Sequence, residues 1–288
     1  MMSFSTSSAS TPALSPFPAV YLLSISLPLL VFSETTSFYA GHAVFKIICS
    51  ISFASGPLLV SAEWSLYRLL ITSGLLFSFV GDICLIPSRN EYYHSSSHLV
   101  AASRVAGEGT ITRDPPKQET ISTSFKLGIL AFAGAHIAYI LAFLRNADRI
   151  SWPSLVSTFA ASMAAAKWLG AIYPAPRPSP WNNILNLSIS REMRPLVFAY
   201  ATIISSMLAV SAATTVPASS TTWPRQRLLG AGMFVISDLF VAKDAFGNSD
   251  VPRGAEKARI RRHSWPKIAL GWGLYFWGQM ILAGTVYG

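Results

Sequence analysis

Charged side chains are scarce in this chain of 288 residues. Only 12% of the residues are Asp, Glu, Lys or Arg, whereas a soluble domain usually contains about a quarter. Hydrophobic residues make up 51%, and a disordered chain lacks the apolar residues that a buried core requires. The composition therefore excludes both a water-soluble enzyme and an intrinsically disordered protein.

Cysteine is nearly absent as well. The two cysteines, Cys49 and Cys84, both lie inside apolar segments. They are too few for a disulfide framework or a four-ligand zinc site. We expect both to be free residues that take part in packing.

Long apolar runs dominate the sequence instead. Each has about 17 to 22 residues, the length that crosses the hydrocarbon layer of a bilayer as a helix. The eight runs cover residues 17–33, 38–55, 65–86, 124–144, 152–172, 194–213, 227–246 and 266–287. They predict an all-α, polytopic membrane protein with eight transmembrane helices in one bundle.

The remaining segments define the domain organisation. Residues 1–16 are rich in Ser, Thr and Pro and carry no charge, which predicts a disordered tail before a single domain at 17–288. Residues 87–123 are predicted to form a mobile loop insert. The first run, interrupted by Ser24, Ser26 and Pro28, has the alternative of a signal-peptide core, but no Lys or Arg precedes it, which favours a retained span.

The distribution of basic residues predicts the orientation. Fifteen Lys and Arg residues fall on the side of the 87–123 loop and five on the side of the termini. The positive-inside rule therefore places both termini on the non-cytoplasmic face of a multi-pass membrane protein. In a eukaryotic host we expect the endoplasmic reticulum or another internal membrane. The basic cluster at 253–262 fits contact with anionic lipid, so the net charge of +9 requires no nucleic-acid partner.

Polar residues inside the runs are the candidates for function, because an ionisable group at membrane depth is costly unless it is paired or faces a wet cavity. Their predicted depths agree with one polar cavity that opens toward the cytoplasm. Lys167 is set apart, since we expect it to extend to the interface or bind a carbonyl. The candidates are His42, Lys46, Asp82, His136, Tyr139, Tyr200, Asp238, Tyr275 and Gln279.

Several of these residues lie in recognisable motifs. They are Gly81-Asp82, the segment FAGAHIAY at 132–139, the segment GAGMFVISD at 230–238, and Tyr275 with Gln279. In this order and at these depths they resemble the signatures of the YhhN family, which includes the mammalian transmembrane lysoplasmalogenases. Two positions depart from the family pattern: Ile47 follows Lys46 where Pro is common, and the 87–123 connection is longer than usual.

The resemblance implies hydrolysis of the vinyl ether bond of a lysoplasmalogen to a fatty aldehyde and a glycerophospho-base. Asp82 and Asp238 would be the catalytic pair, one protonated and one ionised, as the two carboxyl groups of glycosidases are. No metal or other cofactor is required, and the partners would be the lysophospholipid substrate and membrane lipid. The implied substrate-binding residues are Lys46, His136, Tyr139, Tyr200, Ser237, Tyr275 and Gln279.

Two other functions remain open from the sequence. A transporter or channel would use the same intramembrane carboxyl groups as proton or cation sites. A non-catalytic lipid-binding protein would keep the polar cavity without the reaction. The oligomeric state is open too.

Overall fold

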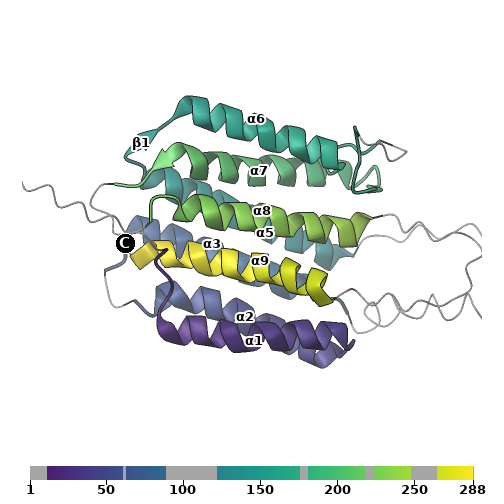
Figure 1. Ribbon diagram of the computed structural model, residues 1–288, viewed down its shortest axis with the longest axis horizontal. Coiled ribbons are helices and arrows are strands. Elements are labelled where there is room, and N and C mark those ends of the chain that lie inside the picture. The colour runs from purple at the N-terminus through teal and green to yellow at the C-terminus, as the bar shows by residue number, and fades with distance from the viewer. Residues whose placement is uncertain are drawn as a thin grey trace, which may run out of the picture.

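The computed structural model describes residues 12–60, 63–88, 122–175, 181–217, 223–247 and 265–287. These residues form an all-helical bundle, with one pair of two-residue strands (Figure 1). The helices are α1 (Phe17–Thr35), α2 (Tyr39–Leu58), α3 (Leu66–Cys84), α5 (Thr123–Arg145), α6 (Trp152–Leu169), α7 (Arg194–Ala213), α8 (Gln226–Phe246) and α9 (Trp265–Gly284). The strands are β1 (Arg149–Ile150) and β2 (Thr214–Thr215), and a short 3-10 helix (Thr285–Tyr287) follows α9.

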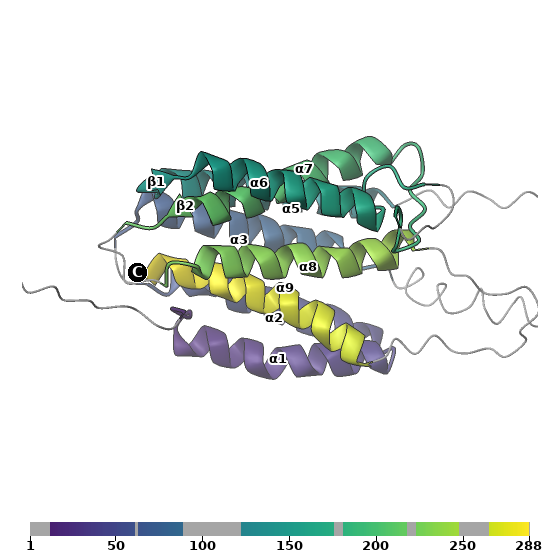
Figure 2. The same ribbon diagram turned by 45° about the horizontal axis from the view of Figure 1, so that its top comes forward.

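Consecutive helices alternate in direction along the long axis of the bundle (Figures 1 and 2). Helix α9 is central, since it packs against α1, α2, α3 and α8. Helix α6 lies at the edge, where it packs mainly on α7 and has no buried residue. Strands β1 and β2 pair antiparallel and tie the connection that follows α5 to the end of α7.

The two ends of the described chain meet at one end of the bundle. The amide N–H of Ala13 donates to Oε1 of Gln226 over 2.9 Å, and Nε2 of Gln226 donates to the carbonyl oxygen of Ile281 over 2.9 Å. Gln226 begins α8 and Ile281 lies in the last turn of α9. One buried amide side chain therefore joins the start of α8, the end of α9 and the segment before α1.

Helices α3 and α5 pack closely because glycine removes side chains from their contact. A Cβ atom on Gly74 would run into the ring of Tyr139, and one on Gly81 would run into the ring of Phe132. Both glycines are on α3 and both rings are on α5. Small residues of this kind let membrane helices approach each other, and here they bring the turn that contains Asp82 against α5.

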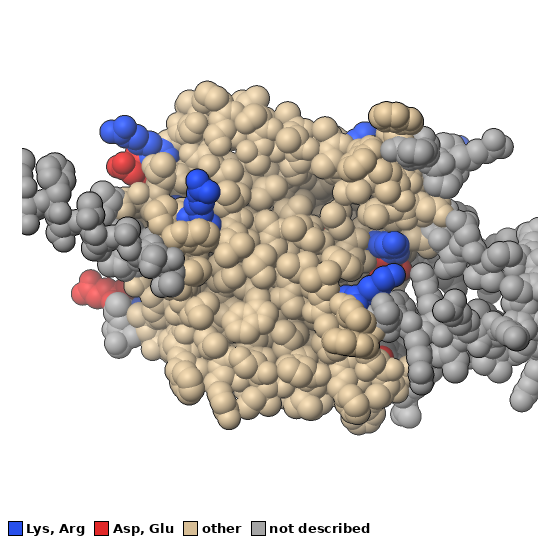
Figure 3. Space-filling view, viewed as in Figure 1, with Lys and Arg blue, Asp and Glu red and all other residues tan. Residues whose placement is uncertain are grey.

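The outer surface of the bundle is apolar. Leu76, Phe77 and Val80 of α3 are 44%, 47% and 47% exposed, although a helix on the surface of a soluble protein turns such residues inward. Figure 3 shows charged side chains near the two ends of the molecule and an uncharged band between them. This pattern is the one that a bilayer imposes on a helical bundle.

Four helices are long and apolar enough to cross a membrane, by the criterion of length and hydropathy applied to the described residues: α1, α3, α5 and α7. The structure thus supports a membrane protein. That α2, α6, α8 and α9 also cross the bilayer stays a prediction, as does the side on which the termini lie. Their sequences have more polar residues, several of which form the site described below.

The helix bounds differ from the predicted runs by at most three residues. The run 152–172 was too long, because Gly170 adopts a left-handed conformation (φ 93°) and ends α6 at Leu169, as glycine often does after a helix. The first run forms α1, which continues through Pro28 to Thr35 and packs on α2 and α9. The predicted tail at 1–16 and the insert at 87–123 lie largely outside the described residues.

Three smaller predictions are confirmed. Cys49 and Cys84 are free thiols, and Cys49 packs in the core, with its Sγ 3.1 Å from Oγ of Ser26. Lys167 binds a carbonyl, since its Nζ donates to the oxygen of Tyr173 over 2.9 Å. None of these residues is needed to explain the cavity.

Two arginines at the end of the bundle that holds the termini are structural. Arg68 donates to the carbonyl oxygen of Pro57 from Nε and Nη2, over 3.1 and 2.6 Å, at the end of α2. Arg227 stacks over the ring of Tyr67 at 4.9 Å and donates to the carbonyl oxygen of Asn146. Both are buried, and they satisfy the carbonyl groups that a helix leaves unpaired at its C-terminus.

The predicted orientation is tested by glycosylation tagging. Acceptor sequons appended to both termini are expected to be modified, and one inserted near Ser96 is expected to stay unmodified, because the basic excess holds that loop in the cytoplasm. Modification of only one terminus would contradict an even number of spans and would show that at least one helix does not cross the membrane.

Candidate functional site

A cavity of about 510 Å³ lies inside the bundle, and every one of the eight helices contributes to its lining. The volume is within the range of small-molecule sites, about 300 to 1,000 Å³. The lining comes from the C-terminal parts of α1, α3, α6 and α8 and from the N-terminal parts of α2, α5, α7 and α9. The cavity thus occupies the half of the bundle that is remote from the termini, where sequence reasoning expected a polar cavity.

Asp82 is the buried acid at one side of this cavity, and it is held by groups from two helices, α2 and α9. Oδ2 accepts hydrogen bonds from Oγ of Ser50 on α2 and from the hydroxyl of Tyr275 on α9, each over 2.7 Å. Oδ1 lies 3.7 Å from Nζ of Lys46 on α2. We call Lys46, Ser50, Asp82 and Tyr275 the Asp82 cluster. Its carboxylate has a cation and two hydroxyl donors, a set that suits an ionised group.

The Asp82 cluster continues to the end of α1. Nζ of Lys46 lies 5.2 Å from the ring centroid of Trp272, and the indole N–H of Trp272 donates to Oε2 of Glu34. Nδ1 of His42 is 3.8 Å from the same Glu34 oxygen. Sequence reasoning missed Ser50, Trp272 and Glu34. Glu34 follows the predicted end of the first run by one residue, and an acid at that position is the signal that would have found it.

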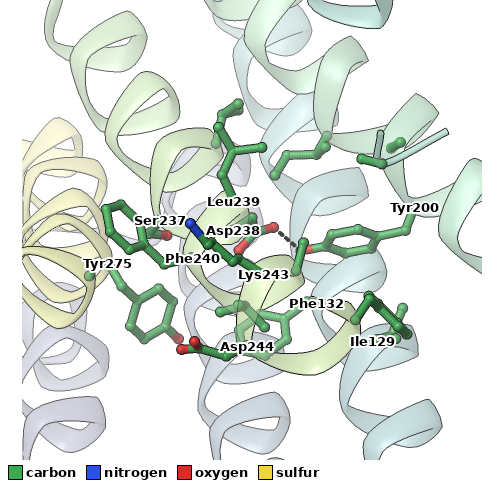
Figure 4. A pocket seen from close by; sticks show the side chains of 18 of the residues that line it. Ile129, Phe132, Tyr200, Ser237, Asp238, Leu239, Phe240, Lys243, Asp244 and Tyr275 are labelled. Carbon is green, nitrogen blue, oxygen red and sulfur yellow. Dashed lines mark hydrogen bonds between the residues drawn. The ribbon is translucent and has the colours of Figure 1, made fainter. Parts of the chain in front are cut away.

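Asp238 on α8 has a different environment. Its Oδ2 lies 2.6 Å from the hydroxyl of Tyr200 on α7, and that hydroxyl is 3.1 Å from Nε2 of His136 on α5. Figure 4 shows Tyr200 on one side of Asp238 and Tyr275 on the other. We call His136, Tyr200 and Asp238 the Asp238 cluster. No cation within 4.0 Å of this carboxyl group is found in the described part of the chain.

The surroundings of His136 bear on the protonation of Asp238. Nδ1 lies 3.2 Å from Sδ of Met207, and a thioether accepts hydrogen bonds but has none to donate. The hydroxyl of Tyr200 donates to Oδ2 of Asp238, so Nε2 of His136 faces the oxygen of that hydroxyl. An imidazolium facing a carboxylate would place two charges in a buried site at a cost of several kcal/mol each. This arrangement favours a protonated Asp238.

A third set of polar residues lies behind the cavity wall. The hydroxyl of Tyr139 donates to Oε1 of Gln279 over 2.7 Å, and Nε2 of Gln279 donates to Oγ of Ser78 over 2.9 Å. Tyr139 and Gln279 are fully buried, as is His136, and none of the three lines the cavity. They are placed to hold helices α3, α5 and α9 in position rather than to touch a bound molecule.

The structure brings most of the predicted site residues to one cavity. Those that line it are Lys46, Asp82, Tyr200, Ser237, Asp238 and Tyr275. The hydroxyl of Ser237 donates a hydrogen bond to the carbonyl oxygen of Phe234 over 2.7 Å. Within the described residues no three His, Cys, Asp or Glu side chains gather closely enough to hold a metal ion.

The two acids have separate partners. Lys46 pairs with Asp82 rather than with Asp238, because α2 packs on α3 and on α9. Each acid also has its own hydroxyl donors, Ser50 and Tyr275 for Asp82 and Tyr200 for Asp238.

The fold and the cavity define a class: an α-helical membrane protein with two differently paired carboxyl groups in one internal cavity. The chain belongs to the YhhN family, whose sequence model matches residues 41–286. The matched segment includes both acids and every helix except α1. Comparison with curated proteins and with solved structures gives no match.

The buried ion pair makes a first prediction for this site. Lys46→Met leaves the carboxylate of Asp82 without its cation, and losing one partner of a buried pair costs about 3 to 5 kcal/mol. Adding Asp82→Asn is expected to restore most of the lost stability, because neither charge then remains. Unfolding in detergent micelles measures both variants. A double variant no more stable than Lys46→Met would contradict the pairing.

The protonation of Asp238 can be measured without any substrate. Infrared spectroscopy at neutral pH is expected to show the C=O band of a protonated carboxyl group that disappears in Asp238→Asn and persists in Asp82→Asn. A band lost in Asp82→Asn instead would reverse the assignment of the two acids.

Proposed function

We propose that this protein is a membrane-embedded hydrolase that cleaves the vinyl ether bond of lysoplasmalogens and releases a fatty aldehyde and a glycerophospho-base. One observation supports this most strongly: Asp82 and Asp238 line the same cavity of a YhhN-family protein in contrasting surroundings. An acid and a carboxylate that face one substrate are what hydrolysis through a cationic intermediate requires.

Asp238 is the general acid in this proposal. Hydrolysis of a vinyl ether begins when a proton adds to the alkenyl carbon remote from the ether oxygen, which leaves an oxocarbenium ion. A carboxyl group with a single hydroxyl partner, Tyr200, has its proton available for that step. His136 acts behind Tyr200 and is a positioning residue, since it does not reach the cavity.

Asp82 is the carboxylate that stabilises the cation and takes a proton from the attacking water. Addition of that water gives a hemiacetal, which breaks down to the aldehyde and the free glycerol hydroxyl. Ser50, Tyr275 and Lys46 hold the carboxylate in place, and preorganised donors of this kind avoid reorganisation during the reaction. Lys46 therefore belongs to the acid-base machinery, and its charge is paired with the carboxylate of Asp82.

Aromatic residues pack around the two acids. Phe234 packs edge-on against Tyr275 and against His136, with ring centroids 5.3 and 4.5 Å apart. Phe132 contacts the rings of Phe234 and Tyr275 as well. A mostly apolar cavity suits a substrate whose reacting bond joins a hydrocarbon chain to glycerol.

Replacing either acid tests the reaction. Asp238→Asn keeps the size of the side chain and removes the transferable proton, so aldehyde release is expected to fall by at least about a hundredfold, the lower end of general acid-base contributions. Asp82→Asn is expected to behave alike. The double variant is expected to lose little more than either single one, because residues that act as a unit are not additive.

The measurement is aldehyde release from a lysoplasmalogen by purified protein in detergent, with an ester-linked lysophospholipid as the control substrate. Unfolding of each variant is recorded in parallel, and Lys46→Met/Asp82→Asn provides a variant without an unpaired buried charge. Wild-type protein that binds the lipid but releases no aldehyde would identify a lipid-binding protein. Proton or ion flux in liposomes that both substitutions abolish would identify a transporter.

A further inference from the structure

The cavity has a charged end that the proposed reaction does not use. Lys243 and Asp244 lie in the last turn of α8 and Lys267 in the first turn of α9, and all three line the cavity. Their side chains are exposed, so their charges remain in contact with water. Lys46, by contrast, is buried and paired with Asp82, which leaves Lys243 and Lys267 as the basic groups at the cavity mouth among the residues that the structure describes.

The part of the cavity that α6 and α7 line, which we call the arm, is apolar. Residues of α6 and α7 form it: Ser162, Ala165, Ala166 and Leu169 from α6, and Val197, Ala201, Ile204 and Ser205 from α7. Its two hydroxyl groups bond to each other, since Oγ of Ser162 lies 2.9 Å from Oγ of Ser205. No polar group of this arm therefore needs a partner from a ligand, and the arm fits a hydrocarbon chain.

We infer that Lys243, Lys267 and Asp244 form the headgroup site of a zwitterionic lysophospholipid. The two lysines bind its phosphate and Asp244 binds its amine or quaternary ammonium group. The hydrocarbon chain lies in the arm between α6 and α7, and the glycerol passes between Asp82 and Asp238. This inference rests on the proposed function and adds to it the orientation of the substrate and the residues that bind its headgroup.

The spacing along α8 fits this orientation. Asp238 and Lys243 are five residues apart, which is about 7.5 Å along a helix axis. In a lysoplasmalogen six single bonds separate the alkenyl carbon on the ether oxygen from the phosphorus, and extended they span about 7 Å at ordinary bond lengths. When the phosphate is bound at the height of Lys243, the vinyl ether therefore lies at the height of Asp238 along the axis of α8.

The charges at the mouth also select the headgroup. Two cations and one anion complement a phosphate that is followed by a positive amine, whereas a headgroup that ends in phosphate would place its negative charge near Asp244. A headgroup without phosphate would leave both lysines without a contact. The site therefore favours phosphoethanolamine or phosphocholine over either alternative.

Binding of a lipid that cannot react tests this site. The probe is a lysophospholipid with a saturated ether chain and a phosphocholine headgroup, and its binding to purified protein in detergent is followed by calorimetry. Lys243→Gln and Lys267→Gln are each expected to weaken binding about two- to fivefold, the size of a charge contact that stays open to water. The double variant is expected to lose about tenfold. Asp244→Asn is expected to reduce the preference for phosphocholine over a phosphate-only headgroup.

Lys126→Gln is the matched control. Lys126 lies in the first turn of α5, at the same end of the bundle, but does not line the cavity. An ether lipid with a glycerol headgroup and no phosphate is the matched ligand, and its affinity is expected to be unchanged in every lysine variant. Loss in Lys126→Gln equal to that in Lys243→Gln, or equal loss of the phosphate-free lipid, would overturn the assignment.

The two proposals fail separately. Binding that depends on Lys243 and Lys267, together with no release of aldehyde from the vinyl ether lipid, would support the headgroup site and reject the hydrolase. Release of aldehyde with equal efficiency from substrates with and without phosphate would support the hydrolase and reject the headgroup site.

Discussion

The hydrocarbon layer of a bilayer offers no water to the polar groups of a helical membrane protein, and this constraint shapes the whole bundle. Buried hydroxyl groups donate hydrogen bonds to backbone carbonyls of their own helix, as those of Ser26 and Ser33 do on α1. Where a helix ends, a long side chain reaches its free carbonyls, as Arg68 does at Pro57.

Groups that cannot be satisfied locally are paired between helices. These interhelical pairs join α2 to α3 through Lys46 and Asp82, α7 to α8 through Tyr200 and Asp238, and α5 to α9 through Tyr139 and Gln279. Each pair fixes the rotation of two helices about their axes. The same bonds that make the polar residues tolerable in the membrane therefore also position the side chains of the cavity.

The contrast between the two acids follows from which helices surround them. Asp82 faces α2 and α9, which supply an ammonium group and two hydroxyls, whereas Asp238 faces α7, which supplies one hydroxyl backed by a histidine and a thioether. Two chemically identical side chains thus have different hydrogen-bond and charge partners, as the paired acids of hydrolases do. In the proposed reaction this difference makes Asp238 the proton donor and Asp82 the proton acceptor.

Much of the architecture was predictable from the sequence because hydrophobic length and Gly or Pro punctuation determine where a membrane helix begins and ends. The depth of Asp82 and Asp238 along their helices followed from the same runs. The partners did not, because they depend on the rotation and packing of helices distant in the chain. Lys46 illustrates this: its sequence position is compatible with either acid, and only the contact of α2 with α3 selects Asp82.

Small and neutral residues were also invisible to a search for ionisable groups. Ser50 carries no charge, and nothing in the run that contains it marks it as a donor to Asp82. Trp272 reads as one more aromatic residue of an apolar helix until its N–H is found on Glu34. His136, Tyr139 and Gln279 were identified as polar and buried, yet the sequence does not distinguish a side chain that faces a cavity from one that braces the wall behind it.

The contact of Ala13 with Gln226, which also binds Ile281, brings the beginning and the end of the bundle together. Termini that lie this close permit circular permutation. A short linker from the end of α9 to the start of α1, with new ends opened between α3 and α5, would reorder the chain as α5 to α9 followed by α1 to α3. Asp82 would then reach the cavity from the last helix made and Asp238 from an earlier one. Such a rearranged gene would change the order in which the helices are made while keeping the same residues around the cavity.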